Sequence, residues 1–75
     1  MQHWEYCEVR WVPDRITCSV YSARGFERRA LEPVLWGQLL ADLGNQGWEM
    51  TGITSSPVQQ QEYYFYFKRS FVNSQ

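Results

Sequence analysis

Two thiols and one imidazole are the side chains of this 75-residue chain best suited to metal chemistry. Cys7 and Cys18 are its two cysteines, and His3 is its single histidine. A structural zinc site takes four ligands, and His3 stands next to a terminus, where chains tend to fray. We therefore interpret Cys7 and Cys18 as small buried hydrophobic residues, and we expect no metal and no other cofactor.

Arginines gather between positions 22 and 32, where Arg24, Arg28 and Arg29 could converge on a phosphate or a carboxylate. Two glutamates in the same stretch partly offset their charge. We expect the stretch to be a solvated loop that connects a hairpin to a helix. The three arginines remain candidates for anion binding, because loops on a rigid scaffold often carry function.

Catalytic patterns are missing from the sequence. It contains no Ser/His/Asp constellation, no carboxylate pair at a defined spacing and no glycine-rich phosphate loop. Glu49, beside Trp48, is the one carboxylate that could act as a base if it were buried, and a surface carboxylate is the simpler interpretation. We predict that the chain is not an enzyme.

Composition disfavours two classes of partner and favours a third. The net charge of −1 creates no field that attracts nucleic acid, and the chain has no apolar run of about 20 residues to enter a membrane. The N-terminus lacks the features of an export signal, so we expect a cytoplasmic protein with reduced thiols. Four Trp, five Tyr and four Phe are more aromatic surface than so short a chain hides easily, which indicates self-association.

The first 21 residues predict a hairpin of two strands, 4–12 and 16–21, joined by a turn at Pro13-Asp14. A two-residue turn would pair Val12 with Arg15. Carried outward, this register places six apolar residues on one face and leaves the other face mixed, as a half-buried sheet requires. The pairs on the apolar face are Trp11 with Ile16, Val9 with Cys18 and Cys7 with Val20, so that Cys7 and Cys18 are diagonal neighbours.

A helix is expected from Glu32-Pro33 to Leu43, because proline suits the first helical turn. The apolar residues spaced for one helix face are Trp36, Leu39, Leu40 and Leu43. We expect Gly44 to end the helix with a positive φ, and Gly47 to permit the turn that follows.

The remainder predicts a second hairpin, with strands 48–55 and 62–69, a loop at 55–61 and a frayed tail at 72–75. The last strand is aromatic on both faces, since Tyr63, Phe65 and Phe67 alternate with Tyr64 and Tyr66. The fold class is therefore α+β: one domain over residues 1–75, with a four-stranded antiparallel sheet, one helix on one face and the order β-β-α-β-β.

One helix can cover one face of that sheet, so the other face should hold exposed aromatic rings. We expect it to make a homo-oligomer, with a dimer as the first hypothesis, because aromatic residues are enriched in interfaces. The alternative is a module in which the same rings stack on a small ligand, a nucleotide or single-stranded nucleic acid. The candidate residues are Trp4, Tyr6, Tyr21, Tyr64 and Tyr66, with Arg10, Lys68 and Arg69 at the edges.

Three segments of the chain resemble a known family. They are Trp4-Glu5-Tyr6, the core Leu40-x-x-Leu43-Gly44-x-x-Gly47-Trp48-Glu49-Met50 and the closing Phe67-Lys68-Arg69. Together they resemble the small bacterial domain-of-unknown-function family numbered four-one-seven-seven. The resemblance implies a compact α+β unit, bacterial or phage-borne, with no known catalytic residues. The chain departs from the family pattern at Cys7-Glu8 and in its arginine-rich 22–32 stretch.

Overall fold

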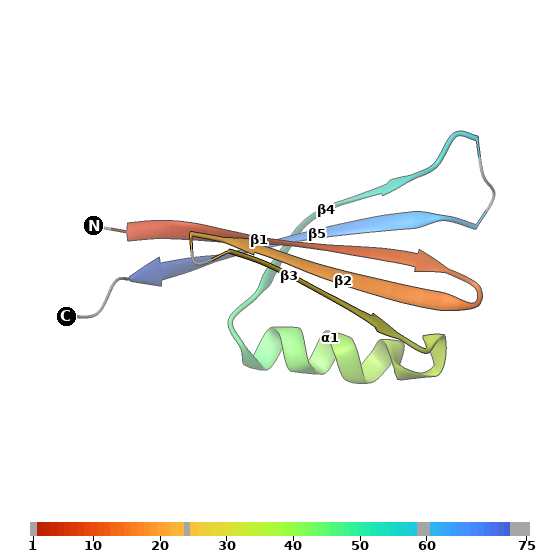
Figure 1. The fold of residues 1–75 in the computed structure, drawn as a ribbon, viewed down its shortest axis with the longest axis horizontal. Coiled ribbons are helices and arrows are strands. Elements are labelled where there is room, and N and C mark those ends of the chain that lie inside the picture. The colour runs from red at the N-terminus through yellow and green to blue at the C-terminus, as the bar shows by residue number, and fades with distance from the viewer. Residues whose placement is uncertain (1, 24, 59–60, 73–75) are drawn as a thin grey trace.

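The computed structural model describes residues 2–23, 25–58 and 61–72, which form one antiparallel sheet and one helix (Figure 1). The sheet has five strands in the spatial order β3-β2-β1-β5-β4, and α1 lies along one of its faces. In chain order the elements are β1 (Gln2–Val12), β2 (Arg15–Ser22), β3 (Gly25–Leu31), the 3-10 turn η1 (Pro33–Leu35), α1 (Trp36–Asn45), β4 (Glu49–Ser55) and β5 (Tyr63–Val72).

The expected four-stranded sheet with the order β-β-α-β-β is wrong, because the predicted loop at 22–32 contains a strand. β3 pairs with β2 along its whole length, and the order of elements is β-β-β-α-β-β. β3 lies at an edge of the sheet, and all its residues except Leu31 are exposed. Such a strand contributes backbone hydrogen bonds and charged side chains in place of an apolar face, so its sequence lacks the usual strand pattern.

The register predicted for the first hairpin is confirmed. Val12 lies opposite Arg15, and the partners continue to Tyr6 opposite Tyr21. The same register makes Cys7 and Cys18 diagonal neighbours on the face that α1 covers. Since one residue of slip would turn every side chain to the other face, this register decides which residues enter the core.

β1 is the central strand, and its pairing with β5 joins the two hairpins over ten residue pairs. β5 lies between β1 and β4, so both of its edges are paired in the sheet. The frayed tail was expected at 72–75, but Val72 still belongs to β5. Residues 73–75 lie outside the described residues.

The core lies between α1 and the sheet. The predicted helix face is confirmed: Leu39 and Leu43 are buried, Trp36 and Leu40 are half-buried, and the Trp36 ring packs on Phe65 at 4.8 Å between centroids. The buried core consists of Cys7, Val9, Ile16, Cys18, Leu39, Leu43, Trp48 and Phe67.

The end of α1 differs from the expectation, because Gly44 is helical and the positive φ of +87° belongs to Gly47. The Trp48 N–H donates to the Leu43 carbonyl at 2.9 Å, and the Gly47 N–H donates to the Gly44 carbonyl at 3.0 Å. These two bonds form a Schellman motif with Gly47 in the left-handed position. The motif turns Trp48 back into the core beside Leu43.

The two glycines provide a matched pair of substitutions, since an added Cβ meets nothing within 4 Å at either position. Gly47→Ala should destabilise the fold by roughly 1–2 kcal/mol, because alanine pays a steric cost at a left-handed φ. Gly44→Ala should stabilise it by up to about 1 kcal/mol, because alanine is the better helix former. Urea unfolding of the two variants measures both. Equal effects of the same sign would contradict this assignment of the helix end.

Candidate functional site

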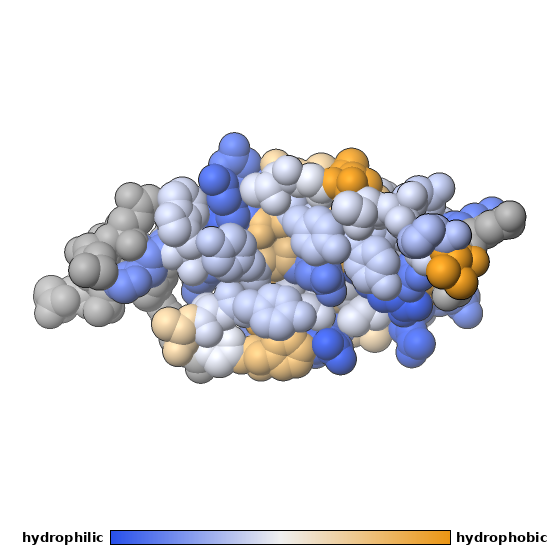
Figure 2. Space-filling view, turned by 90° about the horizontal axis from the view of Figure 1, so that it is seen from above, coloured by the Kyte–Doolittle hydropathy of each residue, from blue (hydrophilic) through white to orange (hydrophobic). Residues whose placement is uncertain are grey.

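The sheet face opposite α1 carries the aromatic residues expected there. Strand alternation turns the side chains of Trp4, Tyr6, Tyr21, Tyr64 and Tyr66 to this face, together with Arg10 and Lys68. Figure 2 shows the molecule from this side, where pale side chains of intermediate hydropathy fill the middle of the surface. We call this surface the aromatic face and define it by six rings: Trp4, Tyr6, Tyr21, Phe26, Tyr64 and Tyr66.

Phe26 is the ring that sequence reasoning missed, because it belongs to the unexpected strand β3. It lies opposite Tyr21 in the register, and the two ring centroids are 5.0 Å apart. Phe26 is 51% exposed and Tyr21 42%, while Trp4 and Tyr6 are 46% and 55% exposed. These four rings therefore keep about half of their surface in contact with solvent.

Cations lie over two of these rings. The Lys68 Nζ is 4.6 Å from the centre of the Trp4 ring, and the Arg28 guanidinium is 5.0 Å from the centre of Phe26. Arg28 also donates from Nε to the Ser19 hydroxyl at 3.2 Å. The attraction between a cation and the ring face holds these long side chains flat against the sheet.

A buried carboxylate fixes one end of the aromatic face. Arg10 and Tyr64 both donate to the same oxygen of Glu62, the tyrosine hydroxyl at 3.0 Å. The Arg10 guanidinium, followed by the Tyr64 hydroxyl, holds the pKa of Glu62 below its ordinary value, and Glu62 raises the pKa of Arg10. Arg10 is thus engaged inside the chain and is poorly placed to bind a ligand.

Arg69 lies on the opposite face from the one expected. Its Nε donates to Glu5 at 2.6 Å, one of its terminal nitrogens donates to the Gln46 carbonyl at 2.9 Å, and its guanidinium lies 4.4 Å from the centre of the Trp48 ring. Glu5 is buried, so this ion pair neutralises a charge beside the core. Arg69 therefore joins β5 to the end of α1 and does not border the aromatic face.

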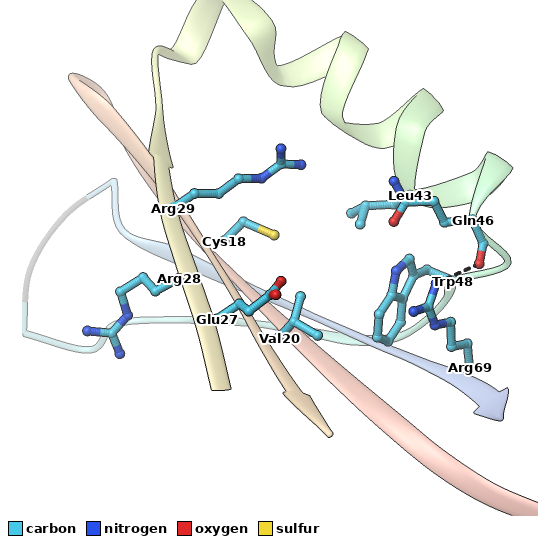
Figure 3. Close-up of a pocket in the computed structure, with 9 residues that line it drawn as sticks. All are labelled: Cys18, Val20, Glu27, Arg28, Arg29, Leu43, Gln46, Trp48 and Arg69. Atoms are coloured by element: carbon cyan, nitrogen blue, oxygen red, sulfur yellow. Dashed lines mark hydrogen bonds between the residues drawn. The ribbon is translucent and has the colours of Figure 1, made fainter. Parts of the chain in front are cut away.

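Arg28 and Arg29, two of the three arginines proposed as an anion site, do not converge. Arg28 and Arg29 are neighbours in β3, so they point to opposite faces of the sheet (Figure 3). Arg24 lies outside the described residues. The convergence expected from a loop is lost because this part of the chain is extended.

A hollow of about 520 Å³ opens on the α1 side of the sheet, next to the end of the helix (Figure 3). Arg29 reaches from β3 across Cys18 towards α1. Sequence reasoning missed this hollow because it depends on β3, whose register places Arg29 opposite Cys18. Its lining includes Cys18 and Val20 of β2, Glu27 and Arg29 of β3, and Leu43, Gln46, Trp48 and Arg69 on the far side.

Cys18, which lines this hollow, contacts a second thiol, that of Cys7. The Cys7 Sγ and Cys18 Sγ are 3.6 Å apart, both residues are buried, and they do not form a disulfide. The contact with the Cys7 sulfur, together with the positive charge of Arg29 and a hydrogen bond from it, lowers the pKa of Cys18. The same contact between the thiols, and burial, raise the pKa of Cys7.

Two further candidates have ordinary surroundings. His3 is exposed, and no cluster of three metal-ligating side chains occurs among the residues that the structure describes. Glu49 is exposed on β4 opposite Lys68, so the buried base considered for it is not formed. Within the described ranges, no helix has the length and apolar character needed to cross a membrane.

Comparison with known proteins adds no relative. No family model, no curated protein and no solved structure matches the chain. The resemblance to the domain-of-unknown-function family stays a prediction, and the site has to be interpreted from its own geometry.

The Arg10–Glu62 pair should make stability depend on pH. Because the pKa of Glu62 is lowered in the folded chain, its stabilising contribution is complete above its unfolded pKa of about 4.3 and is lost as the pH falls through the lower folded value. The difference in urea-unfolding free energy between the wild type and Glu62→Gln should be constant from about pH 7 to pH 5 and shrink below about pH 4. In an Arg10→Met background this pH dependence should largely disappear. A difference in unfolding free energy that does not change with pH, with or without Arg10, would contradict the Arg10–Glu62 pairing.

Proposed function

We propose that this chain is a self-associating interaction module, without enzymatic activity, whose aromatic face packs against the same face of a second copy. The observation that carries the proposal is the set of four half-exposed rings, Trp4, Tyr6, Tyr21 and Phe26, on a sheet face that α1 does not cover. Exposed aromatic surface gathered on one face is typical of protein interfaces.

The size and shape of the surface suit a dimer. The described chain measures 45 × 24 × 19 Å, and the strands run along its longest dimension. A typical interface buries about 800 Å² on each partner, an area that a five-stranded sheet face of this length can offer. A second copy would also shield the rings that α1 leaves uncovered.

The charges of this face favour a copy of itself. Lys68 and Arg28 lie among the rings, and Glu8 and Glu49 face the same side of the sheet. A two-fold axis places each patch against its own image, so a surface with both signs of charge can pair cations with anions across the axis. A face with one sign of charge would repel its copy.

Ligand stacking is the weaker interpretation of the same rings. Lys68 and Arg28 already lie over Trp4 and Phe26, which leaves less open ring surface for a base to stack on. Arg10, one of the cations that would bind a phosphate beside the rings, is engaged with Glu62. A dimer does not require the ring faces of Trp4 and Phe26 to be free, because the two cations that lie over them can remain in place inside an interface.

Tyr6→Lys tests the dimer, with Tyr63→Lys as its matched control. Tyr6 is 55% exposed on the aromatic face, and Tyr63 is 40% exposed on the side of the sheet that faces α1. Light scattering across a dilution series should give twice the chain mass for the wild type and for Tyr63→Lys. Tyr6→Lys should weaken the dimer at least tenfold, since it buries a second cation next to Lys68, the residue opposite position 6 in the register.

Circular dichroism shows whether both variants keep the wild-type fold, as surface substitutions should. A wild-type monomer at every concentration would refute self-association. Quenching of tryptophan fluorescence by a nucleotide in that monomer would instead support stacking. A dimer that both variants leave intact would place the interface elsewhere.

A further inference from the structure

Cys18, in the lining of the hollow beside α1, and its neighbour Cys7 form a pair of thiols that the aromatic face does not use. Cys7 and Cys18 are on the α1 side of the sheet, and their sulfurs are 3.6 Å apart without a bond between them. We propose that they form a peroxide-sensitive dithiol, in which Cys18 reacts with a hydroperoxide that enters the hollow and Cys7 converts the product to an intramolecular disulfide. This proposal is independent of self-association, because it concerns the opposite face of the sheet.

Access distinguishes Cys18 from Cys7. Only Cys18 lines the hollow, whereas Cys7 lies on the central strand β1 beneath the helix layer. Cys18 is 3% exposed, so its sulfur has little direct contact with bulk water. A hollow of about 520 Å³ nevertheless has ample room for hydrogen peroxide or a small organic hydroperoxide. The two thiols therefore have different roles, with Cys18 attacking and Cys7 resolving.

Arg29 supplies the positive charge that the attacking sulfur needs. It lies opposite Cys18 in the β2–β3 register and extends over it into the hollow (Figure 3). The contact with Cys7 and the positive charge of Arg29 both lower the pKa of Cys18, which favours its thiolate form. The other charged groups around the pair are Glu27 on β3 and the Arg69–Glu5 ion pair, which joins β5 to β1.

The chemistry requires one equivalent of oxidant. The Cys18 thiolate attacks one oxygen of the peroxide, an S–O bond forms as the O–O bond breaks, and hydroxide leaves as Cys18 becomes a sulfenic acid. The Cys7 sulfur then attacks the Cys18 sulfur, its proton leaves with the second oxygen as water, and the disulfide closes. The two thiols are oxidised by two electrons, and the peroxide is reduced to water and hydroxide.

The geometry favours a disulfide that is easily reduced. Cys7 and Cys18 are diagonal partners, and diagonal positions on paired strands lie roughly 7–8 Å apart at Cα. Disulfides normally take about 4.4–6.8 Å, so closing the bond must shift β1 along β2 locally. A strained disulfide has a high reduction potential, and thiols reverse it readily. The pair therefore suits a reversible response better than a permanent cross-link.

The test is to add one equivalent of hydrogen peroxide to the full chain under non-denaturing conditions and follow its intact mass. The wild type should lose two hydrogen atoms while keeping the mass of one chain on a non-reducing gel, and dithiothreitol should restore it. Peptide mapping should find the bond between Cys7 and Cys18. In the Cys7→Ser variant, dimedone should label the sulfenic acid on Cys18.

Arg29→Gln tests the role of the arginine, with Arg15→Gln as a control that removes an equal charge from the exposed end of β2. Arg29→Gln should slow the peroxide reaction roughly tenfold below neutral pH, because losing the nearby positive charge reduces the thiolate fraction of Cys18. Arg15→Gln should react at the wild-type rate. Circular dichroism of each variant checks the fold, and Cys7→Ala replaces Cys7→Ser if the serine prevents folding.

Three results would overturn the proposal. The first is a wild type whose mass does not change in peroxide, although its thiols react once urea unfolds it. The second is dimedone labelling that is no greater on Cys18 in Cys7→Ser than on Cys7 in Cys18→Ser. The third is a product that consists only of chains cross-linked to one another.

Discussion

A single ten-residue helix covers one face of a five-stranded sheet, and the other features of the molecule depend on this imbalance. The apolar side chains that alternation sends towards α1 form the core, with Val9 and Ile16 fully buried. The side chains sent the other way have no second layer above them among the described residues. A sheet of this kind must leave that face polar, or find another surface to cover it.

In this chain, the face that α1 does not cover carries both aromatic and charged side chains. Lys68 and Arg28 lie over rings, and Glu62 is enclosed by Arg10 and Tyr64. Such pairs make the rings compatible with water in the free chain and cover only part of their surface. The same rings remain available to another protein surface, which is why we interpret the face as an interface.

The two faces of the sheet carry different chemistry, although their residues alternate along the same strands. On β1, Tyr6 points outward, and the next residue, Cys7, points into the core beside Cys18. On β3, Arg28 lies over Phe26 and the next residue, Arg29, reaches over Cys18. A surface for protein contact and a hollow with a thiol pair can therefore coexist in one thin sheet with little direct contact between them.

The sequence by itself determined the elements whose side chains alternate in a clear local pattern. Pro13-Asp14 and the apolar alternation around it set the register of the first hairpin, including the diagonal placement of Cys7 and Cys18. The spacing of the leucines set the buried face of α1. These are short-range features, and each depends on residues that are neighbours in the chain or across one tight turn.

Tertiary structure alone decided the rest. β3 is held by backbone hydrogen bonds to β2 at an exposed edge, so its charged sequence carries no apolar signal. β3 places Phe26 on the aromatic face and Arg29 above Cys18. Because the strand is extended, it also turns Arg28 and Arg29 to opposite faces of the sheet. Tertiary structure also decided that the turn after α1 lies at Gly47 and not at Gly44, because burying Trp48 beside Leu43 fixes its position.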